Sequence, residues 1–239
     1  MNIIISGYGR MGKEVEKICI NRGHNIINII DNNDQWTQIK DIDNSTVVID
    51  FSLPDVAVDN ILKCFNLGIP IVTGTTGWHD QLNKISNECE QSGGTLFFAP
   101  NFSIGVNIFF RVNEYLAKVM NGLEDYQIQI DETHHIHKLD APSGTAIAAA
   151  IGIIQNIDRK SAWSLDKEKD GALPIYAHRK GEVTGTHEVI YSSDIDNISL
   201  KHEAKNRSGF ALGAVMAAEF ISGKKGVFSM NELIDSILK

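Results

Sequence analysis

A short apolar run followed by a glycine-rich turn and a helix most strongly limits how this chain can fold. Residues 1–6 read MNIIIS, and residues 7–12 read GYGRMG, which matches the pattern G-x-G-x-x-G. Residues 13–21 have the apolar spacing of a helix. A strand, a glycine turn and a helix in this order predict a dinucleotide-binding unit, in which the glycines let the backbone approach a pyrophosphate at the helix start.

The next segment supplies the acidic residue that such a unit uses. Residues 25–30 are again rich in isoleucine, and this predicted strand is followed by Asp31. A carboxylate in this place accepts hydrogen bonds from the ribose of an adenine nucleotide. The pattern therefore predicts a nucleotide site, while an ordinary glycine turn of an α/β protein without a nucleotide remains the alternative.

Strands and helices go on alternating as far as residue 99. Strands are expected at 47–51, 69–73 and 95–99, and helices at 56–67 and 78–92, which predicts a doubly wound parallel sheet of the Rossmann type. Ligands bind beyond the carboxyl ends of such strands, so we expect these ends to line one crevice. The residues expected to bind the cofactor there are Gly7, Tyr8, Gly9, Arg10, Met11, Gly12, Asp31, Gly74, Thr75, Thr76, Ala99, Pro100, Asn101 and Phe102.

The pattern changes after a helix expected at 105–119. Residues 126–131 alternate as a half-buried strand, and residues 183–191 and 197–202 alternate again as a hairpin. Together with a helix at 146–155 they predict a smaller α+β domain with an open mixed sheet, whose exposed face and edges self-association would cover.

The last apolar helix is expected to return to the first domain. We therefore assign residues 1–104, completed by 208–239, to a dinucleotide-binding domain, and residues 105–207 to a domain for substrate binding and oligomerisation.

Charge and cysteine content limit the partners and the compartment. A net charge of −8 argues against nucleic acid or an anionic membrane, because either partner needs a basic face. Cys19, Cys64 and Cys89 are scattered and odd in number, as in a reduced protein. The chain has no apolar run of about twenty residues, and its start does not resemble a signal peptide. We expect a cytoplasmic protein.

Residues 132–146, which read ETHHIHKLDAPSGTA, carry the clearest chemical signal. His134, His135, His137 and Lys138 supply hydrogen-bond donors and positive charge. This grouping predicts a site for a small anion. A plain surface loop is one alternative. A zinc site with two histidines on one strand face is another, but a neighbouring lysine and the lack of a cysteine pair or HExxH spacing argue against it, so we expect no metal.

A helix start follows this cluster directly. Pro142 suits a first helical turn, and Ser143 and Thr145 are candidate caps. Free backbone N–H groups are expected near Ser143, Gly144 and Thr145, where the helix dipole favours negative charge.

These motifs together resemble the 4-hydroxy-tetrahydrodipicolinate reductases, also called dihydrodipicolinate reductases, of bacterial lysine and diaminopimelate synthesis. The resemblance spans nearly the whole chain, and the segment HHIHKLDAPSGTA is its most specific part. Its other motifs are GYGRMG at 7–12, FSLPD at 51–55, GTTG at 74–77, APNFSIGVN at 99–107, RKGEVTGTH at 179–187 and RSGFA at 207–211.

The resemblance implies a reaction and the residues that perform it. NAD(P)H reduces 4-hydroxy-tetrahydrodipicolinate to tetrahydrodipicolinate with loss of water. His134 corresponds to the catalytic histidine and Lys138 to the proton donor, although a role for Lys138 as a carboxylate clamp stays open. The substrate, a small dicarboxylate, is held by His135, Ser143, Gly144 and Thr145. His187 and Lys201 are assigned by default to the sheet surface, with a place in the site, reached from neighbouring strands, as the alternative.

The resemblance also bears on the cofactor and the assembly. Asn32 stands where some members of the family have an arginine for the 2′-phosphate of NADPH, and Asp31 would repel that phosphate. We expect NADH to be preferred, with Arg10 as the residue through which NADPH is still accepted. The family is typically a homotetramer. The alternatives are another two-domain dehydrogenase, similar to aspartate dehydrogenase, and a non-catalytic nucleotide-sensing module.

Overall fold

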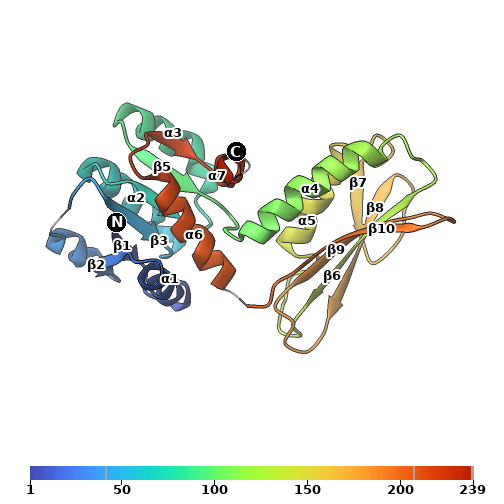
Figure 1. Ribbon diagram of the computed structural model, residues 1–239, viewed down its shortest axis with the longest axis horizontal. Helices are drawn as coiled ribbons and strands as arrows, with labels where there is room; N and C mark the ends of the chain where they lie inside the picture. The colour runs from blue at the N-terminus through green and yellow to red at the C-terminus, as the bar shows by residue number, and fades with distance from the viewer. Residues whose placement is uncertain (41, 207, 238–239) are drawn as a thin grey trace. The chain divides into compact units, whose positions relative to one another are not determined.

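The chain folds into two compact units. A computed structural model describes residues 1–40, 42–206 and 208–237 (Figure 1). Unit 1 comprises residues 1–104 together with the segment from 208 onward, and unit 2 comprises the remainder, from Gly105. None of the helices in these described ranges is long and apolar enough to cross a bilayer.

Unit 1 is built on a six-stranded sheet in which every pair of neighbouring strands is parallel. The strand order is β11-β5-β4-β3-β1-β2, which places the first strand of the chain between β3 and β2. The strands are β1 (Asn2–Ser6), β2 (Asn25–Ile30), β3 (Thr46–Asp50), β4 (Ile71–Thr73), β5 (Thr95–Phe98) and β11 (Gly226–Phe228).

Helices cover both faces of this sheet, and each face has its own apolar core. Alternation along β1 sends Ile3 and Ile5 into the core with α1 (Arg10–Asn21) and α6 (Ser208–Ile221), whereas Ile4 points into the core with α2 (Pro54–Leu67) and α3 (Leu82–Gln91). This arrangement confirms the doubly wound sheet. The helical turns η1 (Asn33–Gln38) and η2 (His79–Gln81) and the helix α7 (Met230–Ile237) complete the unit.

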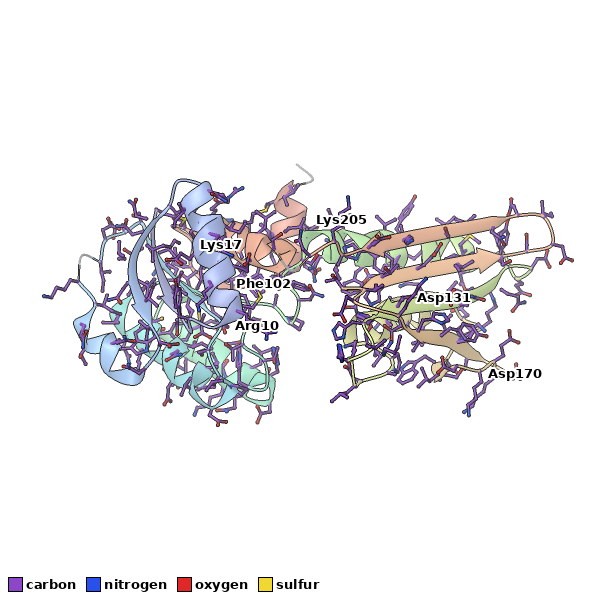
Figure 2. All side chains as sticks on the ribbon, turned by 90° about the horizontal axis from the view of Figure 1, so that it is seen from below. Arg10, Lys17, Phe102, Asp131, Asp170 and Lys205 are labelled. Carbon is purple, nitrogen blue, oxygen red and sulfur yellow. The ribbon has the colours of Figure 1, made fainter. Side chains whose placement is uncertain are left out.

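Unit 2 is a five-stranded mixed sheet with helices on one face. Its order is β10-β9-β6-β8-β7, with antiparallel pairs on the β9 side of β6 and parallel pairs on the β8 side. Its core joins α4 and α5, which lie on one face of the sheet (Figure 1), to the inward residues of the strands. Figure 2 draws the side chains on the ribbon. The elements are α4 (Ile104–Met120), β6 (Gln127–His134), α5 (Gly144–Ile154), β7 (Ala162–Leu165), β8 (Ala172–Arg179), β9 (Thr186–Ser192) and β10 (Asn197–Glu203).

Two strands of unit 2 are not predicted by the sequence patterns. β7 is short, with Ala162 and Trp163 both exposed. β8 contains Pro174, which argues against a strand that is paired on both sides. The register removes the conflict, because Pro174 lies opposite β7 and the pairing of β8 with β6 begins only at Ile175.

Candidate active site

The glycine turn between β1 and α1 is shaped by close backbone contacts. Gly7 has φ +85°, and a Cβ atom there would lie 2.3 Å from the carbonyl oxygen of Phe51. A Cβ atom on Gly12 would lie 2.2 Å from the carbonyl oxygen of Gly7. Gly9 caps the helix, and an added Cβ would have no atom within 4 Å. The turn is therefore tight on its inner side and open at the helix start, as binding of a pyrophosphate requires.

Two adjoining pockets follow the carboxyl ends of the strands in unit 1. One of about 380 Å³ is lined by Gly7, Tyr8, Gly9, Asp31 and Asn32, among others. The second, of about 330 Å³, is lined by Gly9, Arg10, Met11 and residues 74–76. Because Gly9, Phe51 and Ser52 line both, most of the residues expected to bind a cofactor are brought together.

The expected segment 99–102 does not line either pocket. Ala99 and Phe102 are buried in the core beside α6, and Pro100 is exposed. These residues remain a prediction as cofactor contacts.

Asp31 is fixed against the glycine turn. Its Oδ1 atom accepts a hydrogen bond of 3.0 Å from the backbone N–H of Tyr8. The Tyr8 hydroxyl donates in turn to Glu16 of α1. The carboxylate expected to meet the ribose is thus held at the wall of the larger pocket.

A buried polar network lies beneath the pockets. Asp50, at the end of β3, is fully buried, and its carboxylate accepts hydrogen bonds from Asn60 (3.1 Å), Thr73 (3.0 Å) and Thr75 (2.8 Å). The Asn60 amide also donates to Ser6, at 3.2 Å. This network joins three strand ends. Local sequence patterns do not indicate this network, although the aspartate that closes the apolar run VVID was a signal.

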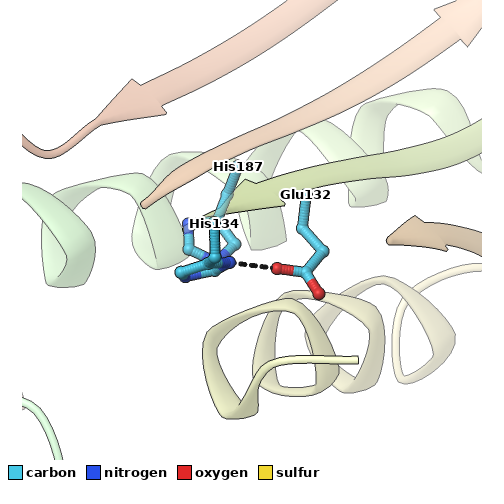
Figure 3. A group of neighbouring side chains, drawn as sticks. All are labelled: Glu132, His134 and His187. Carbon is cyan, nitrogen blue, oxygen red and sulfur yellow. Dashed lines mark hydrogen bonds and ion pairs between the residues drawn. The ribbon is translucent and has the colours of Figure 1, made fainter. Parts of the chain in front are cut away.

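In unit 2, Glu132 and His134 lie side by side on the inner face of β6. Glu132 is fully buried, His134 is 8% exposed, and the His134 Nδ1 atom is hydrogen-bonded to Glu132 Oε2 (Figure 3). Burial by itself raises the pKa of Glu132, but the hydrogen bond and charge of His134 and the charge of Arg179 outweigh it, so the pKa is lowered.

Arg179, the last residue of β8, secures this carboxylate. Its Nη1 and Nη2 atoms each lie 3.2 Å from Glu132 Oε1. Nη2 also donates to the backbone carbonyl of Asp140, at 2.6 Å. Arg179 thereby joins the buried carboxylate to the loop that carries Lys138.

His187 lies inside unit 2 beside His134, so its default assignment to the sheet surface is wrong and the alternative place near the candidate site is the one observed. It is 5% exposed, and its ring packs edge-on against His134 with centroids 5.1 Å apart (Figure 3). Its Nε2 atom lies 3.0 Å from the Ser143 hydroxyl. Burial, followed by the charge of His134, lowers the pKa of His187 to about 4. Position 187 shares its parity on β9 with the buried Val189 and Tyr191, which was the signal for an inward side chain. Lys201, by contrast, lies half-exposed and is paired with Glu203, as expected of a surface residue.

The remaining candidate residues lie on the loop after β6 and differ in exposure and in their contacts. Lys138 contacts both carboxylate oxygens of Asp140 at 2.8 Å, and the hydrogen bond from Lys138 lowers the pKa of Asp140. His135 is partly buried, whereas the His137 side chain is 69% exposed and faces Glu182. Because β6 ends at His134, the strand-face argument for zinc on His135 and His137 fails.

The helix start at α5 agrees with the expected anion site in part. Ser143 is the N-cap and accepts a hydrogen bond of 3.2 Å from the backbone N–H of Ala146. Pro142 precedes the cap and is not in the first turn, and Thr145 lies within the first turn and does not cap. A Cβ atom built on Gly144 meets nothing within 4 Å, so the space beside this residue at the helix start is open. The Ser143 N–H is not available there, because it donates to Glu132.

A metal-like grouping also occurs here. One ligand atom each from Glu132, His134 and His187 lies within 4.8 Å of the others. Arg179 and the backbone of Ser143 already occupy Glu132 Oε1, and the Ser143 hydroxyl occupies His187 Nε2. The geometry is that of a hydrogen-bonded network.

Comparison with known families decides the assignment. The N-terminal domain described as "Dihydrodipicolinate reductase, N-terminus" matches residues 1–102, and the domain described as "Dihydrodipicolinate reductase, C-terminus" matches residues 105–234. The chain belongs to the dihydrodipicolinate reductase family. This confirms the resemblance seen in the motifs, and the nucleotide-binding Rossmann domain of the family supports NAD(P)H as the cofactor.

Individual members of the dihydrodipicolinate reductase family agree along the whole chain. It is 45% identical over 239 residues to the 4-hydroxy-tetrahydrodipicolinate reductase of Christiangramia forsetii, with both chains covered completely. It is 35% identical to the enzyme of that name from Methanococcoides burtonii, over 95% of this chain and 86% of the other.

Among solved structures, the dipicolinate-bound dihydrodipicolinate reductase of Paenisporosarcina sp. TG-14 shares the fold, with a TM-score of 0.78 and 21% identity over 96% of this chain and 97% of the other.

Proposed function

We propose that the protein reduces (2S,4S)-4-hydroxy-2,3,4,5-tetrahydrodipicolinate to (S)-2,3,4,5-tetrahydrodipicolinate with loss of water, using NAD(P)H, in lysine and diaminopimelate synthesis. The observation that carries the proposal is full-length similarity to 4-hydroxy-tetrahydrodipicolinate reductases together with the buried histidine and the open helix start in unit 2. A biosynthetic role of this kind places the protein in the cytoplasm.

The groups of unit 2 suit a dicarboxylate that gains a hydride. The first N–H groups of α5 at Gly144 and Thr145, with the Ser143 hydroxyl and His135, bind one carboxylate at the positive end of the helix dipole. The dipicolinate bound to the reductase of Paenisporosarcina sp. TG-14 is a ligand of this class. The substrate side of the reaction is therefore assigned to unit 2.

Proton transfer is assigned to Lys138 and His134. The bound cofactor supplies the hydride, and negative charge that builds on the substrate needs an acid nearby. The 4-hydroxyl group leaves as water together with a proton from the neighbouring ring carbon, which gives the conjugated imine that accepts the hydride. The Lys138 ammonium then protonates the ring carbon on which negative charge builds, and His134 contacts the reacting part of the ring. In the free protein, the Lys138 ammonium is paired with the Asp140 carboxylate. Lys138 leaves this ion pair when a carboxylate of the substrate takes the place of Asp140.

The cofactor side fits the glycine turn. Gly7 and Gly12 allow no side chain, and the open start of α1 at Gly9 accepts a pyrophosphate. Within the same proposal, NADH is preferred, because the Asp31 carboxylate lies in the larger pocket with Asn32, whereas Arg10 lines the other pocket. The kcat/KM ratio for NADH and NADPH measures this preference, and Asn32→Arg is expected to shift it toward NADPH.

We place the protein in solution as a homotetramer formed through the outer sheet face of unit 2. Gln129, Asp131 and Ile190 alternate outward from the core and are half-buried even in the single chain. Light scattering behind size exclusion should give four times the chain mass of 26.4 kDa, and Ile190→Arg should reduce it.

The decisive experiment is oxidation of NADH or NADPH with substrate made freshly by the preceding synthase. Turnover is expected in the wild type, whereas Lys138→Ala and His134→Ala should lose kcat. A loss confined to KM in either variant contradicts a chemical role for that residue. Absence of turnover in the wild type refutes the proposal and leaves the amino-acid dehydrogenase and nucleotide-sensing alternatives.

A further inference from the structure

We infer that Glu132 is a positioning residue that fixes the His134 ring with Nδ1 protonated and Nε2 presented for chemistry. The inference rests on the proposed function, because it assumes that His134 contacts the substrate. The Glu132 carboxylate is fully buried on β6. A buried charge is costly unless it is paired and hydrogen-bonded, so its surroundings indicate its role.

The contacts of Glu132 leave one oxygen for the histidine. Oε1 accepts from both terminal nitrogens of Arg179 and from the backbone N–H of Ser143, each at 3.2 Å. Oε2 contacts His134 Nδ1. An ionised carboxylate only accepts hydrogen bonds, so the nitrogen that faces it must carry the proton. Neutral His134 is thereby held as the Nδ1–H tautomer.

The opposite side of the ring is kept open by a glycine. A Cβ atom on Gly185 would lie 3.1 Å from His134 Nε2 and 3.4 Å from Cδ2. Within the described part of the chain, His134 Nε2 has no hydrogen-bond partner. One nitrogen is therefore committed to the carboxylate, and the other is free to exchange a proton.

The neighbouring histidine does not compete for that proton. Burial lowers the pKa of His187, which is neutral at physiological pH and packs edge-on against the His134 ring. Arg179 also binds the carbonyls of Lys138 and Asp140, at 3.4 and 2.6 Å. Arg179 therefore binds both the Glu132 carboxylate and the loop that bears Lys138.

Glu132→Gln tests the inference while conserving shape. The amide lacks the charge that favours the imidazolium and can donate to Nδ1, which selects the wrong tautomer. We expect kcat to fall roughly 100-fold, as for other orienting carboxylates. The acidic limb of the kcat/KM profile should move to lower pH, and KM for the dicarboxylate should change far less than kcat. Glu132→Asp, which keeps the charge, should restore the pH profile in part.

Glu124→Gln is the matched control, because it removes the same charge from an exposed position of the same unit. It should leave both kcat and the pH profile unchanged. In Gly185→Ala the new methyl group would contact His134 Nε2, while the contact between Glu132 and His134 Nδ1 stays in place. This variant should therefore lower kcat without moving the pH profile.

A spectroscopic measurement on the wild-type protein is independent of whether any variant folds. In ¹⁵N-histidine-labelled protein, the ring of His134, assigned by its loss in His134→Gln, should show the Nδ1–H tautomer when neutral. Dialysis against EDTA should leave kcat unchanged, whereas a loss restored by Zn²⁺ would make the cluster a metal site and overturn the inference.

Two results separate this inference from the proposed function. An inactive wild type refutes the function, and the tautomer measurement then still decides the positioning of His134. An active wild type whose Glu132→Gln variant keeps its kcat and pH profile, or whose His134 shows the Nε2–H tautomer, refutes the inference and leaves the function intact.

Discussion

Replacing Asn60 by aspartate should make the stability of unit 1 strongly dependent on pH. The Asn60 amide lies 3.1 Å from the buried carboxylate of Asp50. In Asn60→Asp, two carboxyl groups meet at this distance. Two charges 3.1 Å apart repel by about 5 kcal/mol at an effective dielectric constant of about 20.

Protonation limits this cost. Keeping a carboxyl group with an ordinary pKa near 4 protonated costs about 1.4 kcal/mol for each pH unit above that pKa. The cost is about 4 kcal/mol at pH 7 and about 1.4 kcal/mol at pH 5. Since this is less than the repulsion, the pair shares one proton. Folding raises the pKa of the pair, so the loss of stability is absent below about pH 4 and grows as the pH rises.

Urea unfolding followed by tryptophan fluorescence measures the effect. Trp36 and Trp78 pack in the same core as α2, which carries Asn60, and a Trp163→Phe background removes the signal of unit 2. Asn60→Ala is the control, since it loses the hydrogen bond for about 1–3 kcal/mol with little dependence on pH between 5 and 8. A deficit of Asn60→Asp that is equal at pH 5 and pH 8 would refute the reasoning.

Three further predictions concern other parts of the chain. The pKa of His187 is about 4 in the folded protein and near 6.5 in the unfolded chain, so the unfolded chain binds more protons between these pH values. The free energy of unfolding of unit 2 should therefore fall by about 3 kcal/mol as the pH falls from 6.5 to 4. Parallel urea titrations of His187→Gln should lack this loss. Gly12→Ala should lose NADH binding by calorimetry, because its Cβ would lie 2.2 Å from the Gly7 oxygen and must displace the turn; unchanged affinity contradicts the described turn. Asp140→Asn should tighten dipicolinate inhibition by up to about 5-fold, since an exposed ion pair that competes for Lys138 is worth at most about 1 kcal/mol, and weaker inhibition would show that Asp140 assists binding.

The doubly wound sheet was predictable because most of its strands are short apolar runs that alternate with regular helices, although, among the described residues, only the helical turn η1 joins β2 to β3. β1 and β3 read IIIS and VVID, and their residues are almost completely buried on both sides. β8 was not predictable in this way, because Pro174 interrupts its pattern and only the register with β7 makes the proline acceptable.

The sequence predicts which segment carries the candidate site, but only some of the residues that the fold brings together there. The run from His134 to Thr145 marks the place, and Ser143 indeed caps α5. Arg179 and His187 come from strands far along the chain, and local spacing does not show that β8 and β9 flank β6. Glu132 shares the inward parity of Ile128 and Ile130, but only the fold shows that Arg179 meets it there.

The division of unit 1 into two segments sets the order in which a newly made chain can mature. The apolar face of its sheet that carries Ile3 and Ile5 is closed by α6, beginning at Ser208. At roughly 5–20 residues per second, the ribosome needs roughly 5–20 s to translate the intervening unit. During that interval α1 is the helix that covers this face, so part of its apolar surface stays exposed until the residues from Ser208 onward have been made. A chain truncated before α6 should therefore expose this apolar surface and aggregate.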